Sequence, residues 1–79
     1  MDSENLRFVA GKKQILRLAK ENELSQIQIA TDADDSYVAE ILSVAKPHNI
    51  QVVFQNTMQE IAKNCGIEVP CGAVGFLKD

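Results

Sequence analysis

The sequence is poor in the residues from which metal sites and disulfide frameworks are built. It contains two cysteines, one histidine and no tryptophan among 79 residues. A structural zinc needs about four nitrogen and sulfur ligands at close spacing, so we expect no bound metal. Two cysteines without a secretory signal do not indicate a disulfide framework either. Cys65 and Cys71 are therefore expected to be reduced and to pack as small core residues.

Long apolar runs are also missing. No segment approaches the roughly 20 apolar residues of a membrane span, and the first residues, Met-Asp-Ser-Glu-Asn, lack the apolar region of a secretory signal. We therefore expect a cytoplasmic protein that does not contact a membrane. The length favours one domain, residues 1–79. A content of 46% hydrophobic and 24% charged residues is ordinary for a globular chain.

Sequence signatures of enzymes are absent. There is no Gly-rich phosphate-binding fingerprint of the dinucleotide or P-loop type. The one histidine, His48, follows Pro47 near a predicted helix end and has no Ser/His/Asp order around it. The four aromatic residues are spread singly through apolar segments, where we expect core positions and not a stacking platform: Phe8, Tyr37, Phe54 and Phe76. The sequence thus predicts a protein that is not an enzyme and carries no cofactor.

The charges are segregated along the chain. The formal net charge is −3, which by itself argues against nucleic acid as a partner. However, all charged residues within 21–40 are acidic, whereas five of the eight bases lie before them, at Arg7, Lys12, Lys13, Arg17 and Lys20. The acidic total therefore conceals a basic N-terminal quarter, and the placement of each base matters more than the count.

Hydrophobic periodicity predicts strands that alternate with helices. We expect strands at 7–10, 25–30, 50–54 and 72–77, and helices at 12–22, 37–46 and 57–65. Thr57 and Glu60 match a capping box, and Gly66 suits the left-handed position that closes a helix. The strand at 50–54 is nearly all apolar, as in strands buried on both faces. The predicted fold class is α/β, a three-layer α-β-α sandwich around a small mixed four-stranded sheet.

The helix at 12–22 carries the most informative chemistry. Lys13, Arg17 and Lys20 fall within a sector of about 60° on a helical projection, opposite the apolar positions. Gly11 precedes the helix, where unpaired backbone N–H groups and the positive dipole end favour an anion. Lys13, Arg17 and Gln14 can also hydrogen bond to base edges. A basic face that is merely solvated remains the alternative.

Two loops are less decisive. The loop 67–70 places Ile67 and Val69 in a connection, where they either fold over the core or stay exposed to cap an unstacked base or dock a partner. The acidic loop 32–35 lacks the spacing of a calcium loop. Helix capping and the favourable interaction of acids with a helix N-terminus explain the acids of residues 32–35 better.

Three segments together resemble the kink-turn-binding ribosomal protein family, the archaeal L-seven-Ae and eukaryotic L-thirty-e type. They are Val-Ala-Gly-Lys-Lys-Gln at 9–14, Ile-Ala-Thr-Asp-Ala-Asp at 29–34, and residues 58–73 with Lys-Asn-Cys-Gly-Ile-Glu-Val-Pro at 63–70. Their spacing also fits, so the resemblance covers residues 8–77 and is greatest to the small stand-alone bacterial members. It implies a non-enzymatic RNA-binding module that recognises the kink-turn, a sharply bent duplex with a bulge beside sheared G·A pairs.

The resemblance also implies roles for individual residues. Gly11 would permit close approach of the backbone, Lys13 and Gln14 would contact the G·A edges, and Arg17 would take the position of a family lysine. Lys13-Gln14 replaces the archaeal Asn-Glu, and Met58 stands where archaeal and eukaryotic members have a lysine. The remaining implied contacts are phosphate for Lys12 and Lys20, the flipped-nucleotide pocket for Asp34 and Val38, and the bulge for Ile67, Glu68, Val69 and Pro70.

The implied partner is structured RNA containing a kink-turn, with ribosomal RNA and the ribosome as candidates, bound by a monomer. The acids of residues 21–40 should repel generic phosphate, so we expect weak binding to ordinary duplexes. The alternative is an acidic protein–protein interaction module of the same fold with no direct RNA role. In that case Ile67 and Val69 would form a hydrophobic anchor.

Overall fold

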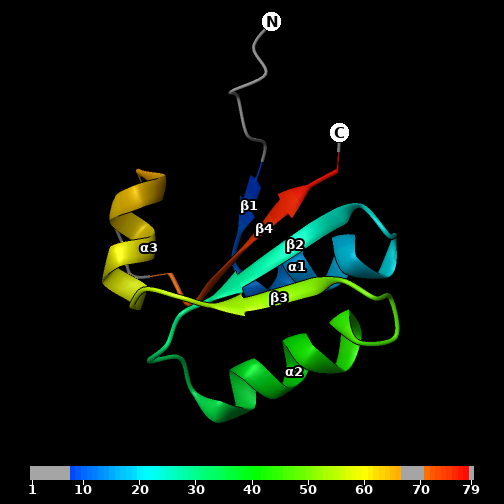
Figure 1. Ribbon diagram of the computed structural model, residues 1–79, viewed down its shortest axis with the longest axis horizontal. Coiled ribbons are helices and arrows are strands. Elements are labelled where there is room, and N and C mark those ends of the chain that lie inside the picture. Colours follow the sequence, from blue (N-terminus) through cyan, green and yellow to red (C-terminus); the bar gives the residue numbers. More distant parts are fainter. Residues whose placement is uncertain (1–7, 67–70, 79) are drawn as a thin grey trace, which may run out of the picture.

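Strands and helices alternate along the whole of the chain that the structure describes. The computed structural model describes residues 8–66 and 71–78. Its elements are β1 (Phe8–Ala10), α1 (Lys12–Lys20), β2 (Leu24–Ile29), α2 (Asp35–Ala45), β3 (Gln51–Phe54), α3 (Met58–Cys65) and β4 (Ala73–Leu77) (Figure 1). Each predicted element is present within a few residues of its expected bounds. Arg7, expected in the first strand, lies outside the described residues.

The four strands form one mixed sheet in the order β1-β4-β2-β3 (Figure 1). β4 is antiparallel to both β1 and β2, while β2 and β3 are parallel. A parallel pair needs a crossover connection, which α2 supplies between β2 and β3. The predicted mixed four-stranded sheet is confirmed.

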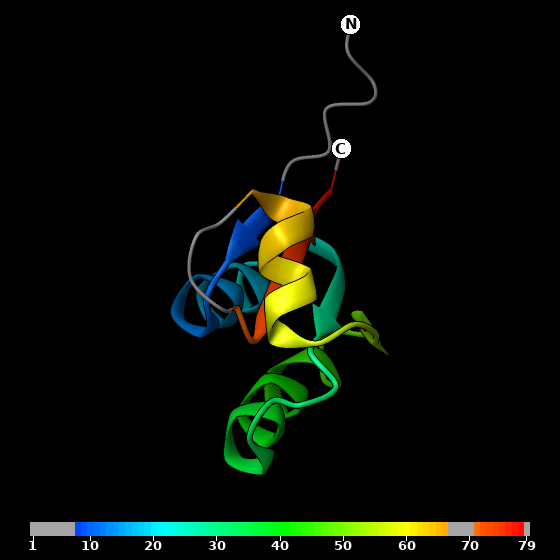
Figure 2. The same cartoon turned by 90° about the vertical axis from the view of Figure 1, so that its left-hand side faces the viewer.

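Helices cover the two faces of the sheet, as predicted. On one face, α1 and α2 bury Ile15 and Ile41 against Ile27 and Ala73 of the sheet. On the other, α3 buries Ile61 against Val74, and Figure 2 shows α3 in front of β4. Ala73 and Val74 are consecutive residues of β4 that face opposite ways, because side chains alternate along a strand. The three-layer α-β-α arrangement is confirmed.

Two expectations about burial are wrong. β3 is not buried on both faces: it lies at the edge of the sheet, and Phe54 in it is 52% exposed. Phe8 in the other edge strand, β1, is 37% exposed, so these two aromatic residues are not core residues. Tyr37 and Phe76 do pack against the buried clusters. Apolar composition alone could not distinguish an edge strand from a central one, because strand order is a long-range property.

The ends of α3 are fixed by local hydrogen bonds, as predicted. The Thr57 hydroxyl accepts a bond of 3.2 Å from the Glu60 N–H, and the Glu60 carboxylate accepts one of 2.8 Å from the Thr57 N–H. Gly66 closes the helix with a left-handed φ of 73°. Among the N-cap candidates in the loop before α2, Asp32 bonds to a different helix: its carboxylate accepts a bond of 2.9 Å from the Met58 N–H at the start of α3. Asp34 does take the N-cap position of α2, though without a side-chain cap bond.

No helix in residues 8–66 and 71–78 is both long enough and apolar enough to span a bilayer.

Candidate nucleic-acid interface

The start of α1 has an open backbone. Gly11 precedes the helix with a φ of 102°, which side-chain-bearing residues rarely adopt. Because Gly11 has no side chain, it cannot cap the helix with a side-chain hydrogen bond, and the first turn of the helix contains no acidic residue. Because the first amides of a helix have no partner inside the helix, they face outward as donors at the positive end of the dipole. This arrangement suits an anionic ligand.

An exposed polar face follows from this start. Lys13, Gln14, Arg17 and Lys20 are all exposed, while Ile15 and Ala19 on the opposite side of the helix are fully buried. The Arg17 guanidinium donates a 2.9 Å hydrogen bond to the Gln14 side-chain oxygen, and it lies 4.0 Å from the Glu21 carboxylate. Such exposed pairs are weak, so a ligand can replace them at little cost.

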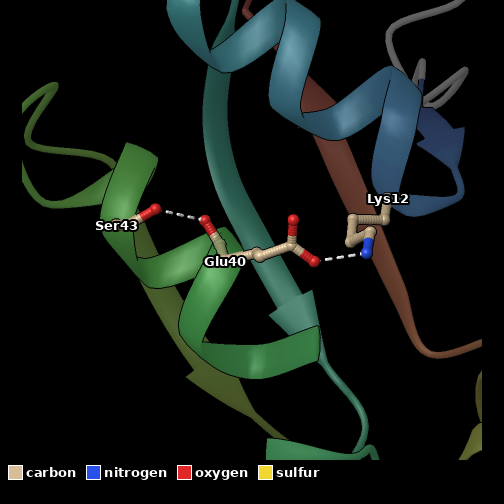
Figure 3. Close-up of polar contacts among 3 residues, drawn as sticks. All are labelled: Lys12, Glu40 and Ser43. Atoms are coloured by element: carbon tan, nitrogen blue, oxygen red, sulfur yellow. Dashed lines mark hydrogen bonds and ion pairs between the residues drawn. The ribbon is translucent and has the colours of Figure 1, made fainter. Parts of the chain in front are cut away.

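Lys12 behaves differently from the other cations of α1. Its ammonium group contacts the Glu40 carboxylate of α2, as Figure 3 shows. The same nitrogen lies 5.5 Å from the centroid of the Tyr37 ring, within cation–π range. Tyr37 and Glu40 were not singled out for the site from the sequence, because nothing in the local pattern links α1 to α2.

Several elements meet at the end of the sheet where α1 begins. The Gly11 N–H donates to the Ala73 carbonyl at 3.3 Å, and the Ala30 N–H donates to the Gly72 carbonyl at 2.8 Å. The start of α1, the end of β2 and the start of β4 are thereby joined. The Cys71 N–H donates to the Met58 carbonyl at 3.2 Å, which adds the start of α3.

The residues expected to line a nucleotide pocket lie at the start of α2. Asp34 is exposed at the N-cap position, and Val38 is half-buried one turn further on, its N–H bonded to the Asp34 carbonyl at 3.0 Å. The loop residues predicted to lie over the bulge, Ile67, Glu68, Val69 and Pro70, fall outside the described residues.

Both cysteines are free thiols. Cys71 is buried in the cluster beneath α3, as predicted, whereas Cys65, the last residue of α3, is only partly buried against that cluster. Burial raises the pKa of the Cys65 thiol, and the nearby Cys71 raises it further. Because the thiolate is the reactive form, a raised pKa makes this thiol a poor nucleophile near neutral pH. Within residues 8–66 and 71–78, no cluster of three or more His, Cys, Asp or Glu side chains is arranged to hold a metal.

Together, the sandwich and the cationic start of α1 define a small α/β binding module. Residues 2–79 match the model of the ribosomal protein L7Ae/L30e/S12e/Gadd45 family, and the chain belongs to this family.

Relatives in sequence have been found in bacteria. An RNA-binding protein of Geobacillus sp. (strain WCH70) is 33% identical over 72 residues, which are 91% of this chain and 88% of the relative. The RNA-binding protein YbxF of Geobacillus stearothermophilus is 32% identical over 72 residues, which are also 91% of this chain and 88% of the relative. These relatives are named as RNA-binding proteins and not as enzymes, in agreement with the expectation that this chain is not an enzyme.

Solved structures share the fold at low sequence identity. The 15.5 kD RNA-binding protein of Giardia lamblia superposes with a TM-score of 0.84 at 19% identity, covering 91% of this chain and 61% of that protein. A protein of unknown function from Bacillus halodurans superposes with the same TM-score at 14% identity, covering 90% of this chain and 71% of that one. Likeness at this level of identity bears on the fold alone.

Proposed function

We propose that this chain is an RNA-binding domain that recognises kink-turns in structured RNA through the start of α1. One observation carries the proposal. Lys13, Gln14, Arg17 and Lys20 form an exposed face of α1, and this face begins immediately after the glycine that starts the helix, Gly11. The names of the bacterial relatives support RNA as the ligand. Ribosomal RNA is one candidate target, and sequencing of RNA crosslinked to the protein in cells would identify the one bound.

The shape of the RNA explains why a helix start would recognise it. An ordinary A-form duplex hides its major-groove base edges in a deep, narrow groove. The sharp bend and sheared G·A pairs of a kink-turn open these edges, so that Lys13 and Gln14 can hydrogen bond to them. Arg17 adds a further donor, and Lys20 contacts backbone phosphate. Asp34 and Val38 line a pocket for a flipped nucleotide at the start of α2, with the 67–70 loop over the bulge.

The test compares a kink-turn duplex with a fully paired duplex of equal length. We expect the protein to bind the kink-turn much more tightly, because the acids of residues 21–40 weaken generic attraction to phosphate. The change Lys13→Ala with Gln14→Ala should reduce this discrimination by several kcal/mol, since each good base contact contributes about 1–3 kcal/mol. Filter binding or calorimetry at fixed salt measures both affinities.

A matched control removes the same residue types elsewhere. Lys46→Ala with Gln51→Ala changes an exposed lysine and an exposed glutamine at the end of α2 and in β3, and it should leave discrimination unchanged. Equal affinity of the unaltered protein for the two RNAs would exclude shape-specific recognition. Absence of RNA binding altogether would favour the alternative, an acidic protein–protein interaction module.

A further inference from the structure

Lys12 is already engaged by the protein. The side chain of Lys12 is 33% exposed, against 59% for Arg17 on the open face of the same helix. Its ammonium contacts the Glu40 carboxylate and lies over the Tyr37 ring, and Figure 3 shows it directed from α1 toward α2. An RNA phosphate would therefore have to displace Glu40 before it could pair with Lys12.

The contacts of Lys12 extend to a third element. The Tyr37 ring packs so closely on Gly72 that a Cβ atom added there would lie 2.9 Å from the ring carbon Cζ. Lys12, Tyr37, Glu40 and Gly72, called here the Lys12 cluster, thus connect the first turn of α1, the first turns of α2 and the start of β4.

Two residues of the Lys12 cluster adjoin residues of the proposed interface. Lys12 directly precedes Lys13 in α1, and Tyr37 directly precedes Val38 in α2. Partly exposed ion pairs and cation–π contacts add little to the stability of a fold. They can nevertheless fix the direction of helices that present binding residues, and a site held in its binding geometry loses less freedom on binding.

We propose that Lys12 is a positioning residue that, with Tyr37 and Glu40, holds the starts of α1 and α2 in the geometry that RNA recognition requires. In this role Lys12 does not neutralise an RNA phosphate, in contrast to the expectation from the resemblance. The inference rests on the proposed function, because it concerns the geometry of that interface.

The change Glu40→Gln separates the two roles by the sign of its effect. If Lys12 positions the helices, loss of the ion pair should lower affinity for the kink-turn severalfold, while affinity for the paired duplex changes no more than it does in the charge control Glu23→Gln. If Lys12 instead contacts phosphate and Glu40 competes for it, the same change should raise affinity for both RNAs by more than Glu23→Gln does. Glu23→Gln is the matched control, because it alters the net charge equally at an exposed acid between α1 and β2.

The salt dependence of binding gives a second, independent measure. Each cation that neutralises a duplex phosphate contributes about 0.9 to the slope of log affinity against log salt. We expect Lys12→Ala to weaken kink-turn binding without changing this slope, and Lys12→Arg to restore binding, because arginine can keep both the ion pair and the cation–π contact. Thermal unfolding of each variant verifies that it is folded.

The outcomes distinguish this inference from the proposed function. Failure of the unaltered protein to prefer the kink-turn would overturn the proposed function itself. If the unaltered protein does prefer the kink-turn, three results would overturn the positioning role alone. These are a Glu40→Gln variant that binds the kink-turn as tightly as before, a Glu40→Gln variant that binds both RNAs more tightly than the Glu23→Gln control does, and a Lys12→Ala variant with a shallower salt slope.

Discussion

At the scale of single residues, positive φ values occur at residue types that tolerate the left-handed region. In the described part of the chain, the residues other than glycine with positive φ are Asn22, Asn49 and Asn56, at 62°, 55° and 69°. Asparagine tolerates the left-handed region better than most residues, because its short side chain can hydrogen bond locally. Gly66 has the same kind of backbone at the end of α3. This position was predictable, because a glycine after a helical pattern is a local signal.

Gly66→Ala should lower the free energy of unfolding by about 1–2 kcal/mol, the usual cost of a left-handed alanine. A Cβ atom at Gly66 would meet nothing within 4 Å, so the cost comes from the backbone and not from crowding. Urea denaturation measures the change. Gly66→Asn is the control and should cost less, and equal losses in the two variants would contradict this account.

Contacts between distant residues could not be predicted in the same way. The Lys12–Glu40 pair joins residues 28 apart in the sequence, and each side chain alone is typical of a solvated helix face. The loop before α2 offers several N-cap candidates, but the Asp32 carboxylate bonds to the start of α3, 26 residues further on. Sequence spacing identifies a capping residue but not which of two helices it caps.

At the scale of secondary structure elements, α3 was the best predicted element because its signals are local. The reciprocal bonds of Thr57 and Glu60 fix its start, and Gly66 fixes its end. The position of β3 was predicted but its burial was not, since the burial of a strand depends on which strands lie beside it. The sheet order leaves β3 at an edge, with only β2 as a neighbour in the described sheet.

Thr57→Ala should destabilise the protein by about 1 kcal/mol, because one amide at the start of α3 loses its cap. Thr57→Ser keeps the hydroxyl and should recover most of this loss. Hydrogen exchange adds a local measurement: the amide of Glu60, which donates to the Thr57 hydroxyl, should exchange faster in the alanine variant. An unchanged exchange rate there would argue against a stabilising cap.

At the scale of the whole molecule, the alternation of elements was enough to predict the three layers. The small size of the chain has an energetic consequence, because a short domain buries a smaller share of its surface than a long one. The cluster beneath α1 and α2 depends on a few large side chains, and Ile15 is completely buried in it. A single substitution that leaves a cavity in this cluster should therefore remove a large part of the free energy of unfolding.

Ile15→Ala should cost about 2–5 kcal/mol, out of a total of about 5–15 kcal/mol for typical domains. Ile15→Val should cost only about 0.5–1.5 kcal/mol, because it removes a single methylene. Phe54→Ala provides a control at a large side chain that is 52% exposed, and it should cost much less than Ile15→Ala. Denaturant unfolding followed by circular dichroism compares the three variants, and equal losses for Phe54 and Ile15 would contradict the assigned core.

The position of β4 in the sheet also determines when the fold can form during synthesis. β1 is made first among the described strands, yet its partner in the sheet is β4, which ends at Leu77. β4 also separates β1 from β2. The nascent chain can therefore form helices and the β2–β3 pair early, but β1 must wait for almost the whole sequence to emerge. Closing contacts over such a separation is slow, so completion of the sheet should be the late, rate-limiting step of folding.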